Sequence, residues 1–314
     1  MPDSYEKPKL AGGVYAALLT PRRADSTEAD VSVLLNYLDV IAEGGVDGYV
    51  LFGSTGEFIH YDPEERKRLA ALSVKRSRLP MLINVSHSSL AGAVEIAQHA
   101  IDAGAAGLML MPPYFYTYGE EQIFAFYAKF LNAIGGAAPI YLYNLPMFVN
   151  PITPVLAERL LETGSFAGIK DSSGDAAYLQ RLQSLHAKLQ FQLLSGSERL
   201  YPAARRAGAN GIVSGVAAAL PELVVALDRA ITSSDTERGE RLSKRLEEYL
   251  GYLDRFPATV IIRQTAVARG WSFSAVAVPF DEDLSAELIG FHAWFREWWP
   301  PVLGECSLPA AVRT

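Results

Sequence analysis

The chain has 314 residues and half of them are apolar, which is enough for one large α/β domain or two ordinary ones. Its formal net charge is −7 and it has no dense run of lysine and arginine, so it lacks the basic surface that nucleic-acid binding requires. The single cysteine, Cys306, excludes a disulfide framework within the chain.

Two segments bear on the expected location of the protein. Residues 1–10 have no apolar stretch of the kind that marks a signal peptide, so we expect a cytoplasmic protein. Residues 130–157 carry no charge and are long enough to cross a bilayer, but four prolines and a Gly-Gly pair would interrupt a spanning helix. The sequence therefore predicts no membrane segment.

Short apolar runs that are typical of buried β-strands alternate with amphipathic helical stretches. The runs begin at residues 12, 46, 80, 106, 139, 166, 191 and 211. Asp62-Pro63 is a helix-start signal, and Gly104 is placed to end the next helix. Apolar strands that alternate with helices indicate parallel strands buried on both faces, and eight such units predict a (β/α)8 TIM barrel. The alternative is a doubly wound open sheet.

The alternating pattern ends near residue 230. We therefore expect a barrel with the catalytic site over residues 1–230 and a C-terminal helical extension over 231–314. Three helices are expected in the extension, over residues 235–256, 259–270 and 283–301. The cluster of Trp294, Trp298 and Trp299 is expected to pack rather than to bind a ligand.

Lys170 stands at the end of the sixth apolar run, in "FAGIKDSSG". A buried ammonium is costly unless it is paired, neutralised or used. Desolvation lowers the pKa of a lysine and produces a neutral amine, which can form a Schiff base with a carbonyl. The alternative is a structural lysine that pairs with Asp171 or another carboxylate.

Two further strand ends carry candidates, because functional groups gather at the carboxyl ends of barrel strands. Tyr143, in "YLYNLP", would point into the same space as Lys170 and could move protons. Ser54 and Thr55 lie between Gly53 and Gly56, where hydroxyls and backbone N–H groups could bind a carboxylate. The alternatives are a packing tyrosine and an ordinary glycine turn.

The seventh and eighth strand ends carry weaker signals. Glu198 and Arg199 could contact the distal part of a substrate, and the glycine-rich loops there could bind phosphate, which keeps a phosphosugar enzyme open. The five histidines show no metal-ligand spacing, and no G-x-G-x-x-G follows the first strand. We therefore expect no metal and no dinucleotide.

The order of several motifs resembles one known family. They are "GSTGE" at 53–57, "MPPYFY" at 111–116, "YNLP" at 143–146, "GIKDSSG" at 168–174 and "GANGIVSGV" at 208–216. From about residue 10 to residue 280 the chain is similar to the dihydrodipicolinate synthase / N-acetylneuraminate lyase family of pyruvate-dependent class I aldolases.

The resemblance implies a role for each of the central candidates. Lys170 would be the Schiff-base lysine and Tyr143 the proton shuttle, while Ser54 and Thr55 would hold the carboxylate of pyruvate or another 2-keto acid. It also implies a homotetramer, built as a dimer of dimers, that needs no metal or organic cofactor.

The chain departs from both branches of the family that it resembles. Phe148 stands where the synthase branch has an arginine for the carboxylate of aspartate semialdehyde, and Phe115 where it has a tyrosine that crosses the subunit interface. Gly196 and Glu198 match the sugar-binding loop of the lyase branch, but Arg199 replaces its second acid. Arg199 indicates a substrate with a negative distal end, or a local pair with Glu198.

The function expected from these residues is a Schiff-base aldolase or lyase that cleaves or forms a 2-keto-3-deoxy acid, to or from pyruvate and an aldehyde. Three alternatives stay open beside the phosphosugar enzyme: a 4-hydroxy-tetrahydrodipicolinate synthase with Arg199 as the replacement cation, a 2-keto-3-deoxy sugar acid dehydratase, and a non-catalytic 2-keto-acid-binding protein. The expected substrate-binding residues are Gly53, Ser54, Thr55, Phe115, Phe148, Gly196, Glu198, Arg199 and Val213.

Overall fold

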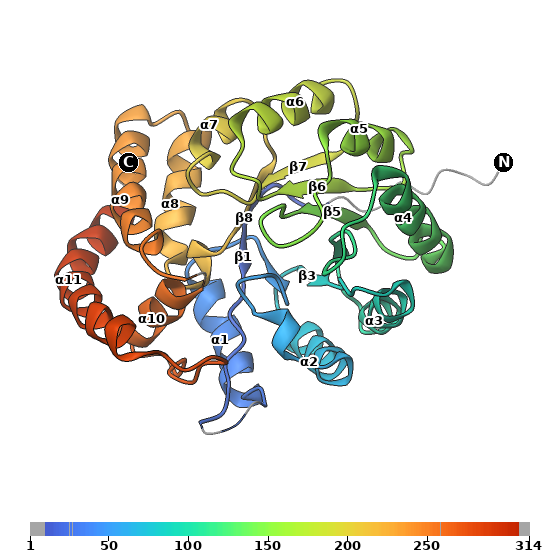
Figure 1. The fold of residues 1–314 in the computed structure, drawn as a ribbon. Helices are drawn as coiled ribbons and strands as arrows, with labels where there is room; N and C mark the ends of the chain where they lie inside the picture. The colour runs from blue at the N-terminus through green and yellow to red at the C-terminus, as the bar shows by residue number, and fades with distance from the viewer. Residues whose placement is uncertain (1–9, 25, 27, 258, 308–314) are drawn as a thin grey trace.

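Eight parallel strands form a closed barrel in a computed structural model that describes residues 10–24, 26, 28–257 and 259–307 (Figure 1). Each strand pairs with the next, and β8 pairs with β1, so the predicted TIM barrel is confirmed and the open sheet is wrong. The strands are β1 (Gly13–Ala17), β2 (Gly48–Leu51), β3 (Met81–Asn84), β4 (Gly107–Leu110), β5 (Ile140–Asn144), β6 (Gly168–Asp171), β7 (Gln192–Ser195) and β8 (Gly211–Ser214).

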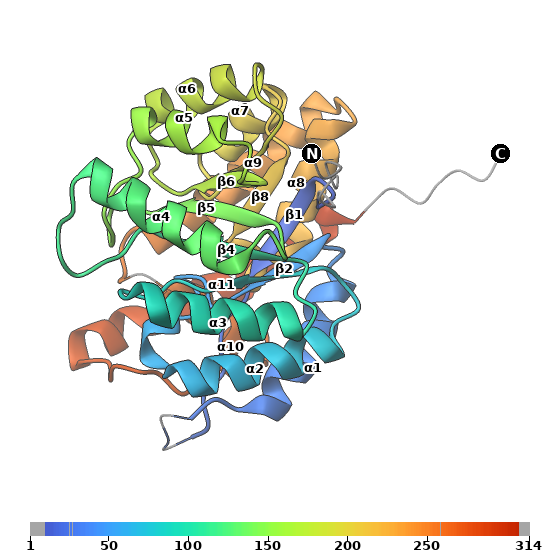
Figure 2. The same ribbon diagram turned by 90° about the vertical axis from the view of Figure 1, so that its right-hand side faces the viewer.

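Helices follow the strands and form the outer layer of the barrel (Figures 1 and 2). They are α1 (Val31–Glu43), α2 (Pro63–Arg76), α3 (Leu90–Asp102), α4 (Glu120–Ile134), α5 (Pro154–Glu162), α6 (Ala176–His186), α7 (Tyr201–Arg206) and α8 (Pro221–Thr232), with short 3₁₀ turns η1 (Phe58–His60) and η2 (Val216–Ala218). In the described part of the chain, no helix has both the length and the apolarity that crossing a bilayer requires.

The predicted helix signals at α2 and α3 are confirmed. The Asp62 side chain accepts a hydrogen bond from the Glu65 backbone, and Pro63 occupies the first turn, where its missing N–H removes no helical bond. Helix α3 ends at Asp102, and Gly104 follows with φ of +86°, a left-handed conformation that glycine adopts without strain.

Large side chains fill the amino end of the barrel. Tyr15 lies over Gly48 of the next strand, where a Cβ atom would stand 2.4 Å from its ring. Tyr141 donates a hydrogen bond of 2.8 Å to the Gln192 side chain, and Gln192 in turn donates to the Leu10 carbonyl. All of these residues are buried, so this end of the barrel is closed by packed, hydrogen-bonded groups. We call Tyr141, Gln192 and Leu10 the hydrogen-bonded plug.

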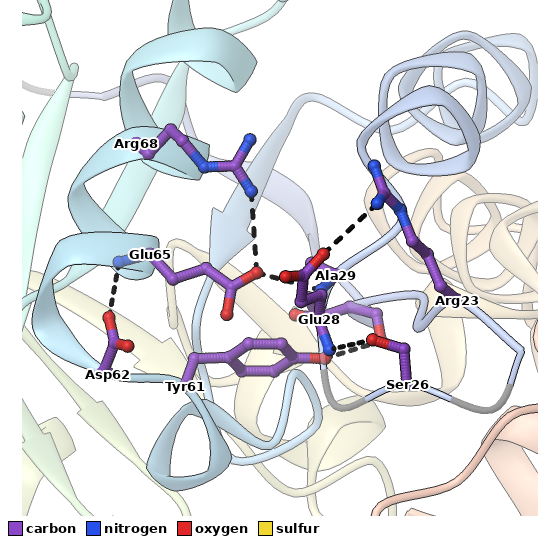
Figure 3. Close-up of polar contacts among 9 residues, drawn as sticks. Arg23, Ser26, Glu28, Ala29, Tyr61, Asp62, Glu65 and Arg68 are labelled. Atoms are coloured by element: carbon purple, nitrogen blue, oxygen red, sulfur yellow. Dashed lines mark hydrogen bonds and ion pairs between the residues drawn. The ribbon is translucent and has the colours of Figure 1, made fainter.

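At the opposite end, the segment between β1 and α1 is tied to the start of α2 (Figure 3). The Glu65 side chain accepts a hydrogen bond of 2.9 Å from the Ala29 backbone and also faces Arg68 at 3.6 Å. The Tyr61 hydroxyl donates to the Thr20 carbonyl at 3.4 Å. These contacts fix the β1–α1 segment beside the loop that follows β2.

Three further helices, α9 (Thr236–Leu253), α10 (Val260–Ala268) and α11 (Glu282–Cys306), lie together outside the barrel next to α8 (Figure 1). Trp294 stacks on Trp298 with ring centroids 4.7 Å apart, so the tryptophan cluster packs as expected. The expected end of α11 at residue 301 is wrong, because the helix continues through Pro300 and Pro301 to Cys306.

Candidate active site

Lys170 and Tyr143 lie side by side on neighbouring strands. They are register partners in the pairing of β6 with β5, and the Lys170 ammonium lies 4.1 Å from the centre of the Tyr143 ring. Lys170 is 4% exposed and Tyr143 is 0% exposed. The prediction that the two side chains share one space at the carboxyl end of the barrel is therefore confirmed.

The proposed pairing of Lys170 with Asp171 is wrong. Successive strand residues point to opposite faces, so Asp171 faces the helical layer while Lys170 faces the interior. The Asp171 carboxylate accepts hydrogen bonds from Asn144 at 2.8 Å and from the Ser173 hydroxyl at 2.9 Å. Among the residues that the structure describes, no carboxylate forms an ion pair with Lys170, so its charge is not balanced by a neighbour.

Tyr143 also contacts the loop after β2. Its hydroxyl lies 3.1 Å from the Ser54 hydroxyl. Burial raises the pKa of Tyr143, but the Lys170 ammonium and the hydrogen bonds from Ser54 and Lys170 outweigh burial and hold the pKa below its ordinary value of 10.0. The lowered pKa makes proton transfer from this phenol easier than from an ordinary buried tyrosine.

The loop that carries Ser54 and Thr55 has an unusual backbone. Phe52 and Glu57, at its two ends, have φ angles of +61° and +53°, which are strained for residues with a side chain. The Asn84 side chain donates a hydrogen bond of 2.6 Å to the Phe52 carbonyl and so supports the strained position. Thr55 is buried and Ser54 is half-buried, in keeping with a site that lies inside the mouth of the barrel.

Gly196, in the loop after β7, lies against the lysine stem. A Cβ atom at this position would stand 2.8 Å from Lys170 Cε and 1.9 Å from the Ser172 hydroxyl, so any side chain would displace one of them. The Glu198 carboxylate accepts hydrogen bonds from the Ser214 hydroxyl at 2.8 Å and from the Val216 backbone at 3.1 Å. These contacts join the loops after β7 and β8.

Arg199 does not pair with Glu198, and that expectation is wrong. Its guanidinium reaches α9, where Nη2 lies 2.8 Å from Asp254 and Nε lies 3.2 Å from Glu247. The guanidinium of Arg199 is therefore engaged by two acidic side chains of the extension. Val213 is buried on β8, in register with Tyr15 of β1.

Phe115 and Phe148 lie on the outer rim of the mouth. Phe115 is 88% exposed with φ of +82°, and Phe148 is 57% exposed. Their two loops are joined by Asn150, whose side chain donates to the carbonyls of Pro113 at 2.6 Å and Tyr116 at 2.8 Å. The site thus has a polar interior and an apolar rim held in a fixed shape.

Sequence reasoning missed the asparagines that support the site. Asn84 holds the loop after β2, and Asn144 holds both Asp171 and the Ile152 backbone N–H. Both end buried strands, where an amide without a partner would be costly. An asparagine at the end of a predicted buried strand could therefore have been identified from the sequence as a supporting residue. The described residues contain no group of three or more His, Cys, Asp or Glu side chains that could hold a metal ion.

The fold is a closed (β/α)8 barrel, and the buried Lys170 and Tyr143 lie together at the carboxyl end of its strands, where barrel enzymes carry their active sites. Residues 10–287 match the Dihydrodipicolinate synthetase family. The chain belongs to this family and is an enzyme of the lyase class.

Named relatives agree with this assignment. The 4-hydroxy-tetrahydrodipicolinate synthase of Salinibacter ruber is 32% identical over 279 residues, 86% of this chain and 89% of that protein. The enzyme of the same name from Methanothrix thermoacetophila is 31% identical over 235 residues, 74% of this chain and 79% of that protein. The dihydrodipicolinate synthase structure from Bacteroides thetaiotaomicron has a TM-score of 0.82 at 25% identity, covering 92% of this chain and 99% of that one.

Proposed function

We propose that the chain is a class I aldolase or lyase in which Lys170 forms a Schiff base with the C2 carbonyl of a 2-keto acid such as pyruvate. The observation that carries the proposal is the buried Lys170, which forms no ion pair with a carboxylate of the described residues and whose Nζ lies 4.1 Å from the centre of the Tyr143 ring. A lysine amine in such a place lies within reach of a carbonyl group bound in the mouth of the barrel.

The reaction proceeds through a covalent intermediate. The Lys170 amine attacks C2 of a 2-keto-3-deoxy acid, and the carbinolamine loses water to give an imine. Tyr143 takes the proton of the C4 hydroxyl, the C3–C4 bond breaks, and its electrons pass to the imine, which leaves an enamine of pyruvate and a free aldehyde. Protonation at C3 and hydrolysis release pyruvate and restore Lys170, with no external cofactor.

Ser54 and Thr55 bind the carboxylate of the 2-keto acid in this proposal. Their hydroxyls lie on the loop that contacts Tyr143, and Gly53 lets the backbone approach the ligand closely. Gly196 leaves room beside Lys170, and Glu198 and Thr55 both lie close to Gly215, just after β8. Val213 lies one position earlier on β8 than the strand end, in register with Tyr15. This is the same set that the sequence predicts, apart from Arg199 and the two rim phenylalanines.

Borohydride reduction in the presence of pyruvate tests the proposal. The reduced imine should add one fixed mass to the peptide that contains Lys170, and Lys170→Ala should remove the adduct. Calorimetric binding of pyruvate without an adduct would refute the mechanism and favour a 2-keto-acid-binding protein. A panel of 2-keto-3-deoxy acids, assayed for pyruvate release and for dehydration, then identifies the substrate.

A second candidate is 4-hydroxy-tetrahydrodipicolinate synthesis from pyruvate and aspartate semialdehyde, the reaction named for the two relatives. It requires a cation for the second carboxylate, and Phe148 and the ion-paired Arg199 do not supply one. Turnover of aspartate semialdehyde with pyruvate would support this candidate, and its absence would remove it.

We also propose that the chain forms a cytoplasmic homotetramer, a dimer of dimers. The rim side chains Phe115, Tyr116, Met147 and Phe148 are all more than half exposed, and a second copy is the occupant that would bury them. Sedimentation analysis tests the assembly, and Phe115→Asp should weaken it. We propose the same division of the chain as the sequence predicts, with residues 1–230 as the barrel and residues 231–314 as its C-terminal helical extension.

A further inference from the structure

Both oxygens of the Glu57 carboxylate are bound by the C-terminal extension. Arg263 of α10 forms an ion pair with Glu57 Oε2, and the Thr259 hydroxyl donates to Glu57 Oε1 at 3.5 Å. Thr259 and Arg263 are four residues apart and therefore lie on one face of the helix start. Glu57 is the last residue of the loop that holds Ser54 and Thr55.

Arg263 is placed to hold more than one segment. It is 1% exposed, and its guanidinium donates to the Thr20 carbonyl at 3.3 Å and to the Ala275 carbonyl at 3.2 Å. Thr20 lies in the segment between β1 and α1, and its carbonyl also accepts a hydrogen bond from the Tyr61 hydroxyl. One buried guanidinium thus joins α10, the β1–α1 segment and the loop after β2.

The backbone of the loop after β2 is strained and therefore needs the contact between Glu57 and α10. Phe52 and Glu57 both have positive φ angles, and Thr259 has φ of +71°. Residues in this region of conformational space keep it only where their surroundings impose it. Within the loop, the Gly56 N–H donates to the Gly53 carbonyl at 3.1 Å, and the Glu57 N–H donates to the Ser54 carbonyl at 3.0 Å. A shift of Glu57 would therefore also move Ser54.

We propose that Glu57 and Arg263 are positioning residues, whose ion pair holds the Ser54–Thr55 loop in the shape that receives the carboxylate of a 2-keto acid. Helix α10 of the extension then supports the carboxylate-binding loop of the active site through Arg263. The inference rests on the proposed function. It adds that carboxylate affinity depends on two side chains that contact neither the substrate nor Lys170.

The extension contains a matched control pair. Arg269 forms an ion pair of 2.6 Å with Glu222 of α8, and both side chains are partly buried. This pair also fastens the extension to the barrel, but it touches no residue of the loop after β2. Glu222→Gln should therefore lower the melting temperature without changing the affinity for a 2-keto acid.

The test uses the whole protein and pyruvate as the probe. Enamine formation exchanges the methyl protons of pyruvate with deuterium from the solvent, so NMR gives both kcat and KM, and borohydride trapping gives an independent half-saturation concentration. Glu57→Gln, which keeps the shape of the side chain, should raise KM about 10- to 100-fold, the factor that losing a charge-assisted hydrogen bond represents. Its kcat should stay within about threefold.

A double variant makes the test specific for the pair. Arg263→Met should raise KM at least as much as Glu57→Gln does, because it also removes the hydrogen bonds to the Thr20 and Ala275 carbonyls. The combined variant should raise KM no further than Arg263→Met alone, because the Glu57–Arg263 ion pair is already absent there. An unchanged KM in folded Glu57→Gln, or an equal rise in Glu222→Gln, would overturn the inference. Failure of the wild-type protein to exchange or to form the adduct would overturn the proposed function itself, and the inference with it.

Discussion

Lys170 and Lys67 are both buried lysines, and their surroundings differ in one decisive respect. Lys67, on α2, is 8% exposed and lies between the carboxylates of Glu64 and Glu95, whose hydrogen bonds raise its pKa. Lys170 is 4% exposed and has a tyrosine instead of a carboxylate. Burial alone therefore does not mark a reactive lysine; burial without a counter-charge does.

The difference between the two lysines is tested most strongly by removing each amine in turn. Lys170→Met should lower turnover about 10⁴-fold or more, because a covalent nucleophile has no substitute. Lys67→Met should leave turnover unchanged. Steady-state rates and adduct mass spectrometry measure both. Equal losses in the two variants would mean that both lysines serve the fold.

Tyr143→Phe tests whether the neighbour of Lys170 does more than fill space. The phenol is 0% exposed, so the change removes only a hydroxyl from a packed site. Turnover should fall about 10³-fold, the usual contribution of a positioned proton-transfer group. Borohydride should still trap pyruvate on Lys170, though more slowly. Full turnover in this variant would assign proton transfer to another residue.

A pair of glycine substitutions sharpens the contrast between the site and the surface. Gly196→Ala places a methyl group 2.8 Å from the Lys170 stem and should lower turnover about 10²-fold through misplacement of the amine. Gly251→Ala, on α9, meets nothing within 4 Å and should raise stability by about 0.5–1 kcal/mol. Rates and thermal melting measure the two effects.

The smallest expected effect is a change in the titration of Tyr143. Its folded-state pKa lies below the unfolded value of 10.0, so the unfolded chain binds more protons in the interval between them, and the linked stability rises with pH there. In Lys170→Met the cation is absent but Tyr143 stays buried, so the pKa of Tyr143 should rise above 10.0. The stability linked to Tyr143 should then fall, and not rise, as the pH increases through this interval. Ultraviolet difference titration against the matching Tyr143→Phe proteins measures it.

Local patterns account for what the sequence predicts correctly. The period-two alternation of β5 and β6 is enough to place Tyr143 and Lys170 on one face, and the same rule places Asp171 on the other. The alternative pairing of Lys170 with Asp171 is wrong because adjacent residues of one strand point to opposite faces.

Contacts between distant segments account for what the sequence does not predict. Arg263 and Glu57 are 206 residues apart, and Arg199 meets an acid 55 residues away on a helix whose orientation no local pattern determines. The predicted helix over 283–301 is too short at its carboxyl end, because α11 continues to Cys306 and packs Val302 and Cys306 in the hydrophobic core.

The hydrogen-bonded plug made by Tyr141, Gln192 and Leu10 has a kinetic consequence. Gly168 registers with Tyr141 and Gln192 just two residues before Lys170, so the plug forms the floor beneath the amine. A molecule attached to Lys170 lies deeper than anything bound at the rim. In the proposed cleavage the aldehyde must therefore depart before the keto acid, and product inhibition should follow an ordered sequence with pyruvate last.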